Sequence, residues 1–138
     1  MNERTKGLNR RARSVLVVDD DDDIRAVLEE VLVDEGCTVH GAASGGEALT
    51  LLRTVVPDLI IFDLMMPGMN GWTFYATLQQ DPELAKIPCV VLSAASHLLP
   101  EGSVMQLRKP IDLSTLLQLL GTIDAPQTAN LPISRSVP

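Results

Sequence analysis

Short apolar runs alternate with amphipathic stretches along most of this chain. Residues 14–18 (SVLVV) are apolar and rich in β-branched side chains, and apolar residues then recur at helical spacing from Ile24 to Leu32. Strand patterns recur at residues 37–40, 58–62, 88–92 and 103–107, and helix patterns at 44–52, 72–80 and 113–120. Strands that are almost wholly apolar are typical of a parallel sheet covered on both faces. The pattern therefore predicts a doubly wound α/β fold.

Helix-capping and helix-breaking residues between these segments predict where the helices begin and end. Gly36 follows the first helical pattern and is expected to end it, and Gly121 is expected to end the last helix. Ser44 and Glu47 have the spacing of a capping box, which predicts a helix beginning after Ser44.

The 138 residues, 46% of them apolar, are sufficient for one domain with a core. We expect a basic disordered leader at residues 1–13, a single domain at 14–121 and a disordered tail at 122–138. A tail of this length is too short to fold an effector domain, so signal output would pass through a partner, or the chain is a fragment of a longer protein.

Charge and cysteine content narrow the class of protein. The net charge is -7, but the leader alone carries +4, so the other 125 residues carry -11, which argues against general nucleic-acid binding. No apolar run is long enough for a membrane helix, and the basic residues at 1–13 are not followed by the apolar region that a signal peptide would have, so we expect no membrane association. Cys37 and Cys89 lie in apolar stretches without metal-ligand or disulfide spacing, which indicates a cytoplasmic location.

Polar residues follow the predicted strands directly. They are Asp19, Asp20, Asp63, Ser93 and Lys109, and the carboxyl ends of parallel strands bring such residues into one crevice. Each close pair of carboxylates would repel by about 4 kcal/mol at an intermediate dielectric constant, so the crevice needs positive charge. Mg²⁺ is the cation usually bound by a few carboxylates, waters and a phosphate. A carboxylate beside Mg²⁺ and an ammonium can attack phosphorus, which predicts phosphoryl transfer.

The segments VLVVDDDDDIR, PDLIIFDLMMPGMNGW, IPCVVLSA and LRKPID resemble the four signature blocks of bacterial response regulator receiver domains. The resemblance covers residues 14–121 and implies a flavodoxin-like fold with a five-stranded parallel sheet in the order 2-1-3-4-5. It also implies a role in two-component signal transduction, with phosphorylation on aspartate by a histidine kinase or a histidine phosphotransfer protein. Such a domain is not an enzyme beyond its own phosphorylation and dephosphorylation, and it acts on a downstream protein target.

The resemblance implies roles for individual acidic residues. Asp63 matches the phosphoacceptor, and Asp19 and Asp20 match the acidic pair. Together with the backbone carbonyl of Met65, these three side chains would hold Mg²⁺, or Mn²⁺ in its place.

The remaining matches lie late in the chain. Ser93 matches the switch hydroxyl, Lys109 the phosphate contact, and Pro110 the proline of a cis Lys-Pro bond. The chain departs from the family in two places: only 16 positions separate Ser93 from Lys109, and Gln106 stands where the family often has a switch aromatic. We therefore expect a fourth helix that is shortened or absent, and an altered readout surface.

A calcium loop is one alternative for the aspartate run. Asp19, Asp21, Asp23 and Glu30 have the spacing of EF-hand ligands, but Ile24 stands where that loop requires glycine, and a strand pattern precedes the run.

Two further alternatives concern the function as a whole. A small phosphatase of the haloacid-dehalogenase type would use a DxDx(T/V) motif; Asp19 and Asp21 match it, but Asp23 does not, and Asp63 would then have no role. A phosphorylation-independent interaction module of the receiver type is favoured by Gln106 and disfavoured by the complete acidic site.

Overall fold

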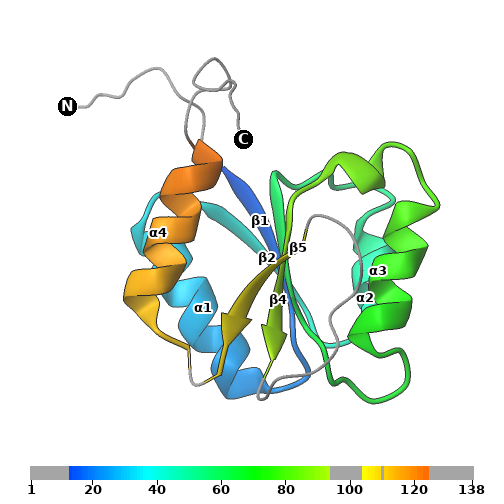
Figure 1. The fold of residues 1–138 in the computed structure, drawn as a ribbon, viewed down its shortest axis with the longest axis horizontal. Helices are drawn as coiled ribbons and strands as arrows, with labels where there is room; N and C mark the ends of the chain where they lie inside the picture. The colour runs from blue at the N-terminus through cyan, green and yellow to red at the C-terminus, as the bar shows by residue number, and fades with distance from the viewer. Residues whose placement is uncertain (1–12, 94–103, 110, 125–138) are drawn as a thin grey trace.

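A computed structural model describes residues 13–93, 104–109 and 111–124 of the chain. Within these residues, helices follow each of the five strands except β4 (Figure 1). The strands are β1 (Ser14–Val18), β2 (Thr38–Ala42), β3 (Leu59–Asp63), β4 (Cys89–Ser93) and β5 (Val104–Arg108). The helices are α1 (Asp22–Asp34), α2 (Gly45–Leu51), α3 (Gly71–Gln79) and α4 (Leu113–Asp124), with a 3₁₀ turn η1 at Leu84–Lys86.

The five strands form one sheet in the order β2-β1-β3-β4-β5, and each neighbouring pair is parallel. The sheet confirms the fold class that the apolar pattern predicts and the strand order that the family resemblance implies. Figure 1 shows the sheet nearly edge-on, with α1 and α4 on one face and α2 and α3 on the other. Because all strands run the same way, their carboxyl ends lie along one edge of the sheet.

Alternating residues of each strand pack into two separate apolar clusters. Val15 and Val17 of β1 face α1 and α4, whereas Leu16 and Val18 face α2 and α3. The strands β3 and β4 are buried at all five positions, because helices cover both of their faces. We refer to these cores as the α1/α4 cluster and the α2/α3 cluster.

Side-chain caps set the start of all four α-helices. Asp21 accepts hydrogen bonds from the amides of Asp23 and Ile24 at the start of α1. Ser44 Oγ accepts from the Glu47 amide at 3.1 Å, as the capping-box spacing predicts. At the start of α3, Asn70 caps the helix through the amide of Thr73. Asp112 accepts a hydrogen bond of 2.9 Å from the amide of Ser114 at the start of α4, so all four loops that lead into α-helices are fixed locally.

Helix ends agree with the sequence at Gly36 but not at Gly121. Gly36 follows α1 with a φ of 91°, a conformation that glycine adopts without strain. The predicted end at Gly121 is wrong, because α4 continues to Asp124. A Cβ at Gly121 would meet nothing within 4 Å, so this glycine lies on an open side of the helix and does not break it.

The described part of the chain holds four α-helices, and none of them lies between β4 and β5, as expected for a shortened or absent fourth helix. Residues 94–103 and the predicted cis-proline Pro110 lie outside the described residues. So do residues 1–12 of the predicted leader and residues 125–138 of the predicted tail. None of the described helices is both long enough and apolar enough to cross a membrane.

Candidate functional site

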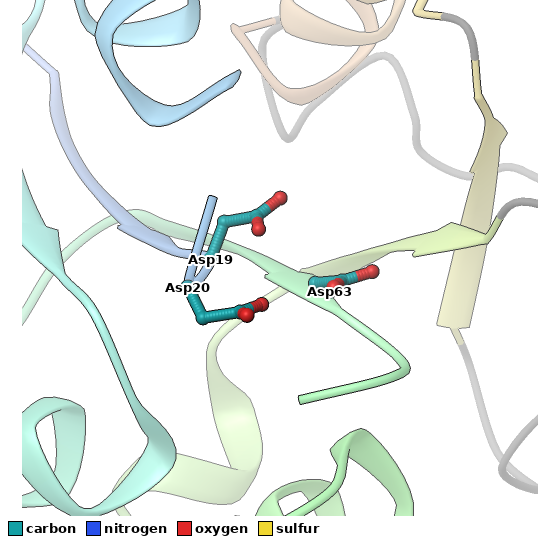
Figure 2. A group of neighbouring side chains, drawn as sticks. All are labelled: Asp19, Asp20 and Asp63. Atoms are coloured by element: carbon teal, nitrogen blue, oxygen red, sulfur yellow. The ribbon is translucent and has the colours of Figure 1, made fainter. Parts of the chain in front are cut away.

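Three carboxylates meet at the carboxyl edge of the sheet. Asp19 and Asp20 directly follow β1, and Asp63 is the last residue of the neighbouring strand β3 (Figure 2). One carboxylate oxygen from each lies within 4.8 Å of the others. Asp19 and Asp63 are buried, while Asp20 is exposed. The site is therefore embedded in the sheet edge and open to solvent on the side of Asp20.

Asp19 is held rigidly by its neighbours. Its amide donates to the carbonyl oxygen of Ala42 at 3.1 Å, and its Oδ1 accepts from the amide of Asp21 at 2.9 Å. Its Oδ2 is buried and accepts no hydrogen bond. A buried carboxylate oxygen without a hydrogen bond is costly, which indicates that this atom has a cationic partner.

Lys109 supplies positive charge to the same site. Its Nζ lies 3.2 Å from Asp63 Oδ1 and 3.5 Å from Asp19 Oδ2. The lysine follows β5, and its amide donates to the carbonyl oxygen of Ser93 at 2.9 Å, which extends the β4–β5 pairing by one residue. Residues that are 46 positions apart in sequence, Asp63 and Lys109, are thus brought into an ion pair by the order of the strands.

Three further predicted site residues lie on β4, on β5 and just after β3. Ser93 is fully buried at the end of β4, beside β3 in the sheet. Met65 follows Asp63 by two residues, its backbone amide donates a hydrogen bond to the Asp63 carboxylate, and the residue as a whole is 55% exposed. Gln106 is exposed on β5, paired in register with Val91. The metal role of the Met65 carbonyl stays a prediction.

Burial shapes the acid–base properties of the site. Desolvation raises the pKa of Asp63, and the ammonium of Lys109 opposes that rise. Desolvation is also the main reason that the pKa of Asp19 is raised. Burial alone would lower the pKa of Lys109, but the nearby carboxylates of Asp19 and Asp63 raise it, so the ammonium stays charged.

The residues present fit a hard divalent cation. Three carboxylates face one ammonium, so the group carries excess negative charge, and the buried Oδ2 of Asp19 has no hydrogen bond. Oxygen ligands in this number, with room for waters on the exposed side, suit Mg²⁺, and Mn²⁺ has the same ligand preference. Asp19, Asp20 and Asp63 would hold the ion.

The family model of the response regulator receiver domain matches residues 15–121. The chain belongs to this family. It is 35% identical over 112 residues to an uncharacterized 14.6 kDa protein of Leptolyngbya boryana, covering 77% of this chain and 86% of that one. It is 30% identical over 115 residues to the protein PilH of Pseudomonas aeruginosa, covering 79% of this chain and 95% of PilH.

Solved structures agree with this assignment. The chemotaxis protein CheY4 of Vibrio cholerae superposes with a TM-score of 0.74 at 32% identity, covering 81% of this chain and 98% of CheY4. Receiver domains generally bind Mg²⁺ through an acidic pocket, and the aspartates at the end of β1 and β3 form such a pocket here.

The alternatives for the aspartate run fit this receiver domain poorly. Asp21 Oδ1 is engaged by two amides at the start of α1, so it serves as a helix cap. Asp23 and Glu30 are exposed on α1. Among the described residues, the acidic groups that converge at metal-binding distance are those of Asp19, Asp20 and Asp63, not those of an EF-hand pattern.

One residue of the site escaped the sequence analysis. Arg25 Nη1 donates a hydrogen bond to the backbone carbonyl oxygen of Asp19 at 2.6 Å. The sequence does show Arg25 at helical spacing from Asp22 and Glu29, which is a signal for ion pairs along α1. It does not show that the guanidinium also reaches the backbone of the acidic pair.

Proposed function

We propose that this receiver domain is a phosphoacceptor switch in which Asp63 takes a phosphoryl group from a phosphohistidine. The donor is a histidine kinase or a histidine phosphotransfer protein, and the reaction depends on Mg²⁺ held by Asp19, Asp20 and Asp63. The observation that carries the proposal is the buried carboxylate of Asp63, 3.2 Å from the ammonium of Lys109 and beside two further carboxylates.

The chemistry is a displacement at phosphorus. An oxygen of Asp63 forms a new P–O bond while the P–N bond to the donor imidazole breaks, and the leaving imidazole takes up a proton from solvent. The product is an acyl phosphate on Asp63. Lys109 lies close enough to neutralise phosphoryl oxygens, and Ser93, at the end of the adjacent strand, supplies a hydroxyl donor. Mg²⁺ held by Asp19, Asp20 and Asp63 would supply further positive charge to stabilise the transferred group.

A groove beside the site suits a helical donor. It has a volume of about 360 Å³ and lies between the first turn of α1 and the start of α4. It is lined by Asp23, Ile24, Val27, Lys109, Ile111 and Leu113. Because Lys109 belongs to both the groove and the site, a partner helix that packs its apolar face here would hold its phosphohistidine near Asp63.

The wider role follows from the same chemistry. We propose that catalysis is limited to the phosphorylation and dephosphorylation of Asp63, and that the phosphorylated form acts on a downstream protein. The two cysteines, Cys37 and Cys89, are buried thiols, which is compatible with the reducing cytoplasm.

A second candidate is a receiver-type interaction module that works without phosphorylation. It is favoured by Gln106, which is exposed and polar at the position where an aromatic side chain usually couples the switch to its surface. The two candidates differ in whether Asp63 accepts a phosphoryl group.

Intact-mass spectrometry after incubation with Mg²⁺ and acetyl phosphate separates them. We expect one phosphoryl adduct on the wild type, lost in Asp63→Asn and lost when EDTA replaces Mg²⁺. Asp34→Asn removes an exposed carboxylate at the end of α1 and is expected to leave the adduct in place. A wild type that stays unmodified, under conditions that label an ordinary receiver domain, would replace the phosphoacceptor proposal with the second candidate.

A further inference from the structure

Arg25 connects α1 to the backbone of the acidic pair. It lies in the first turns of the helix, its side chain is only 20% exposed, and it points back toward the end of β1. There its Nη1 donates a hydrogen bond of 2.6 Å to the carbonyl oxygen of Asp19. A guanidinium bound to a partly buried carbonyl gives a charge-assisted hydrogen bond, stronger than a neutral one.

Two acidic residues of the same helix hold the guanidinium in place. Its Nη2 lies 2.6 Å from Asp22 Oδ1, and its Nε lies 3.9 Å from Glu29 Oε2. The carboxylate of Glu29 in turn lies over Gly41 of β2, where a Cβ would collide with it. Arg25 is therefore fixed from both sides along α1, and the small residue in β2 makes room for that arrangement.

The carbonyl that Arg25 binds belongs to the peptide that joins Asp19 to Asp20. A peptide unit is planar, so fixing its oxygen fixes the orientation of the whole unit and of both Cα positions that flank it. The amide of Asp19 is already bound to Ala42, and its Oδ1 to the amide of Asp21. With the Arg25 contact, every polar group of Asp19 except Oδ2 has a hydrogen bond, and Oδ2 faces the ammonium of Lys109 at 3.5 Å and the metal position.

We propose that Arg25 is a positioning residue that orients Asp19 and Asp20 for Mg²⁺. The inference deepens the proposed function and rests on it. It also gives the fourth aspartate of the run a role: Asp22, together with Glu29, neutralises the guanidinium. Arg25 can then bind the carbonyl without adding net positive charge beside the metal position.

Geometry and charge predict opposite effects when Arg25 is removed. Loss of a cation near three carboxylates would by itself strengthen Mg²⁺ binding, because the site becomes more negative. Loss of the orienting hydrogen bond weakens it, and removing such a supporting contact typically costs about 10-fold to 100-fold in metal affinity. The sign of the change therefore separates a positioning role from a purely electrostatic one.

The test is calorimetric titration of Mg²⁺ at 25 °C into the wild type and Arg25→Met, a variant that keeps the apolar stem but has no donors. We expect Mg²⁺ affinity to fall by about tenfold or more. Arg25→Lys keeps the charge and a donor and is expected to recover part of this loss. Arg53→Met makes the same change at an exposed arginine just after α2 and is expected to bind Mg²⁺ like the wild type.

Hydrogen exchange adds a readout that is independent of metal and activity. In Arg25→Met the amides of Asp19 and Asp21 are expected to exchange faster, while amides of β3 keep their protection. Thermal unfolding followed by circular dichroism verifies that each variant is folded at 25 °C. If Arg25→Met is unfolded, Arg25→Gln takes its place, because a glutamine side chain is two bonds shorter than that of arginine. A fall in its Mg²⁺ affinity relative to the wild type then supports the positioning role in the same way.

Equal or tighter Mg²⁺ binding by the folded variant would overturn the positioning role while leaving the proposed function intact. Failure of the wild type itself to bind Mg²⁺ or to take up a phosphoryl group would instead overturn the proposed function, and the role of Arg25 with it.

Discussion

Asp63 lies where the requirements of folding and of chemistry conflict. Burial raises its pKa, and the ammonium of Lys109, 3.2 Å away, only partly opposes the rise. A carboxyl whose pKa is higher in the folded than in the unfolded protein binds protons more readily when folded. The folded state therefore loses stability as the pH rises through the folded pKa. At neutral pH, a charged Asp63 lowers the stability of the domain unless a cation is bound.

Replacing this charge should stabilise the protein. Without Mg²⁺ at neutral pH, we expect Asp63→Asn to raise the free energy of unfolding on the order of 1 kcal/mol, which is about 4 °C in Tm for a domain of this size. The gain should shrink as the pH falls toward about 4, the ordinary pKa of aspartate, because the wild-type carboxyl is then protonated. Circular dichroism melts across this pH range measure both effects.

Mg²⁺ provides the internal control for this prediction. A ligand that binds the folded state raises its stability, so Mg²⁺ should raise the Tm of the wild type more than that of Asp63→Asn. The exposed Asp34→Asn should follow the wild type throughout. If Asp63→Asn is instead less stable than the wild type at neutral pH without Mg²⁺, the charge of Asp63 is fully compensated in the folded protein.

At the scale of single elements, α3 is held against the end of β3 by a glycine. The amide of Gly71 donates to the carbonyl oxygen of Leu64 at 2.7 Å, and a Cβ at Gly71 would lie 2.7 Å from the Leu64 Cα. That contact involves backbone atoms immediately after Asp63, so a side chain there would have to displace the segment that carries the phosphoacceptor.

Gly71→Ala is therefore expected to cost about 2 kcal/mol or more in stability and to weaken acetyl phosphate labelling of Asp63. Gly46→Ala is the matched control: it lies in α2, a Cβ added there would meet nothing within 4 Å, and alanine should stabilise the helix by about 0.5–1 kcal/mol. Urea unfolding measures both changes. Equal effects of the two substitutions would rule out the clash as the cause.

The groove between α1 and α4 makes a separate prediction about the phosphodonor. Val27 is 50% exposed in this groove, and Val33 is 56% exposed elsewhere on α1. A charge in an apolar interface should slow transfer from a phosphorylated phosphotransfer protein by about tenfold, a loss near 1.4 kcal/mol. Labelling by acetyl phosphate, which needs no docking, should stay unchanged in Val27→Asp.

Val33→Asp adds the same charge to the same helix outside the groove lining and serves as the control for both reactions. Phosphoryl transfer is followed by mass spectrometry, with a donor chosen because it labels the wild type. If Val27→Asp and Val33→Asp transfer at the same rate, the donor docks on another surface.

At the scale of the whole molecule, the features that can be predicted from the sequence are those that depend on the spacing of its apolar residues. Each strand and α-helix of the described residues has a counterpart in the apolar pattern, because β1 and its neighbours bury both faces and the helices bury one. The convergence of Asp19, Asp63 and Lys109 also follows, since the carboxyl ends of parallel strands share an edge. The role of each acid within DDDDD does not follow, because identical residues differ only in which backbone groups they reach.

The wrong helix end at Gly121 and the unpredicted contact of Arg25 have physical causes of the same kind. Gly121 did not end α4, because a glycine on an open side of a helix costs only about 1 kcal/mol relative to alanine. Arg25 was missed because its partner is a backbone carbonyl, and the direction of a carbonyl is set by the turn after β1 and not by residue type. Both depend on three-dimensional detail that side-chain patterns do not carry.

The two cysteines offer a way to ask whether both layers of this fold unfold together. Cys37 packs in the α1/α4 cluster and Cys89 in the α2/α3 cluster, on opposite faces of the sheet. Both thiols are buried and so shielded from a labelling reagent while the protein is folded, and burial also raises the pKa of Cys89 to about 12, so that this thiol is almost wholly protonated at neutral pH. Thiol labelling therefore reports the opening of one layer at a time.

We expect both thiols to label at the same urea concentration. Because β1, β3 and β4 contribute side chains to both clusters, one layer cannot separate without exposing the apolar face of strands that the other layer needs. Cys89→Ala leaves Cys37 as the probe, and Cys37→Ala leaves Cys89; each labelling midpoint is compared with the circular dichroism midpoint of the same variant, which removes the effect of the substitution on stability. A thiol that labels at clearly lower urea than its own variant unfolds would show that its layer opens separately, and the shared strands would not then make the domain a single cooperative unit.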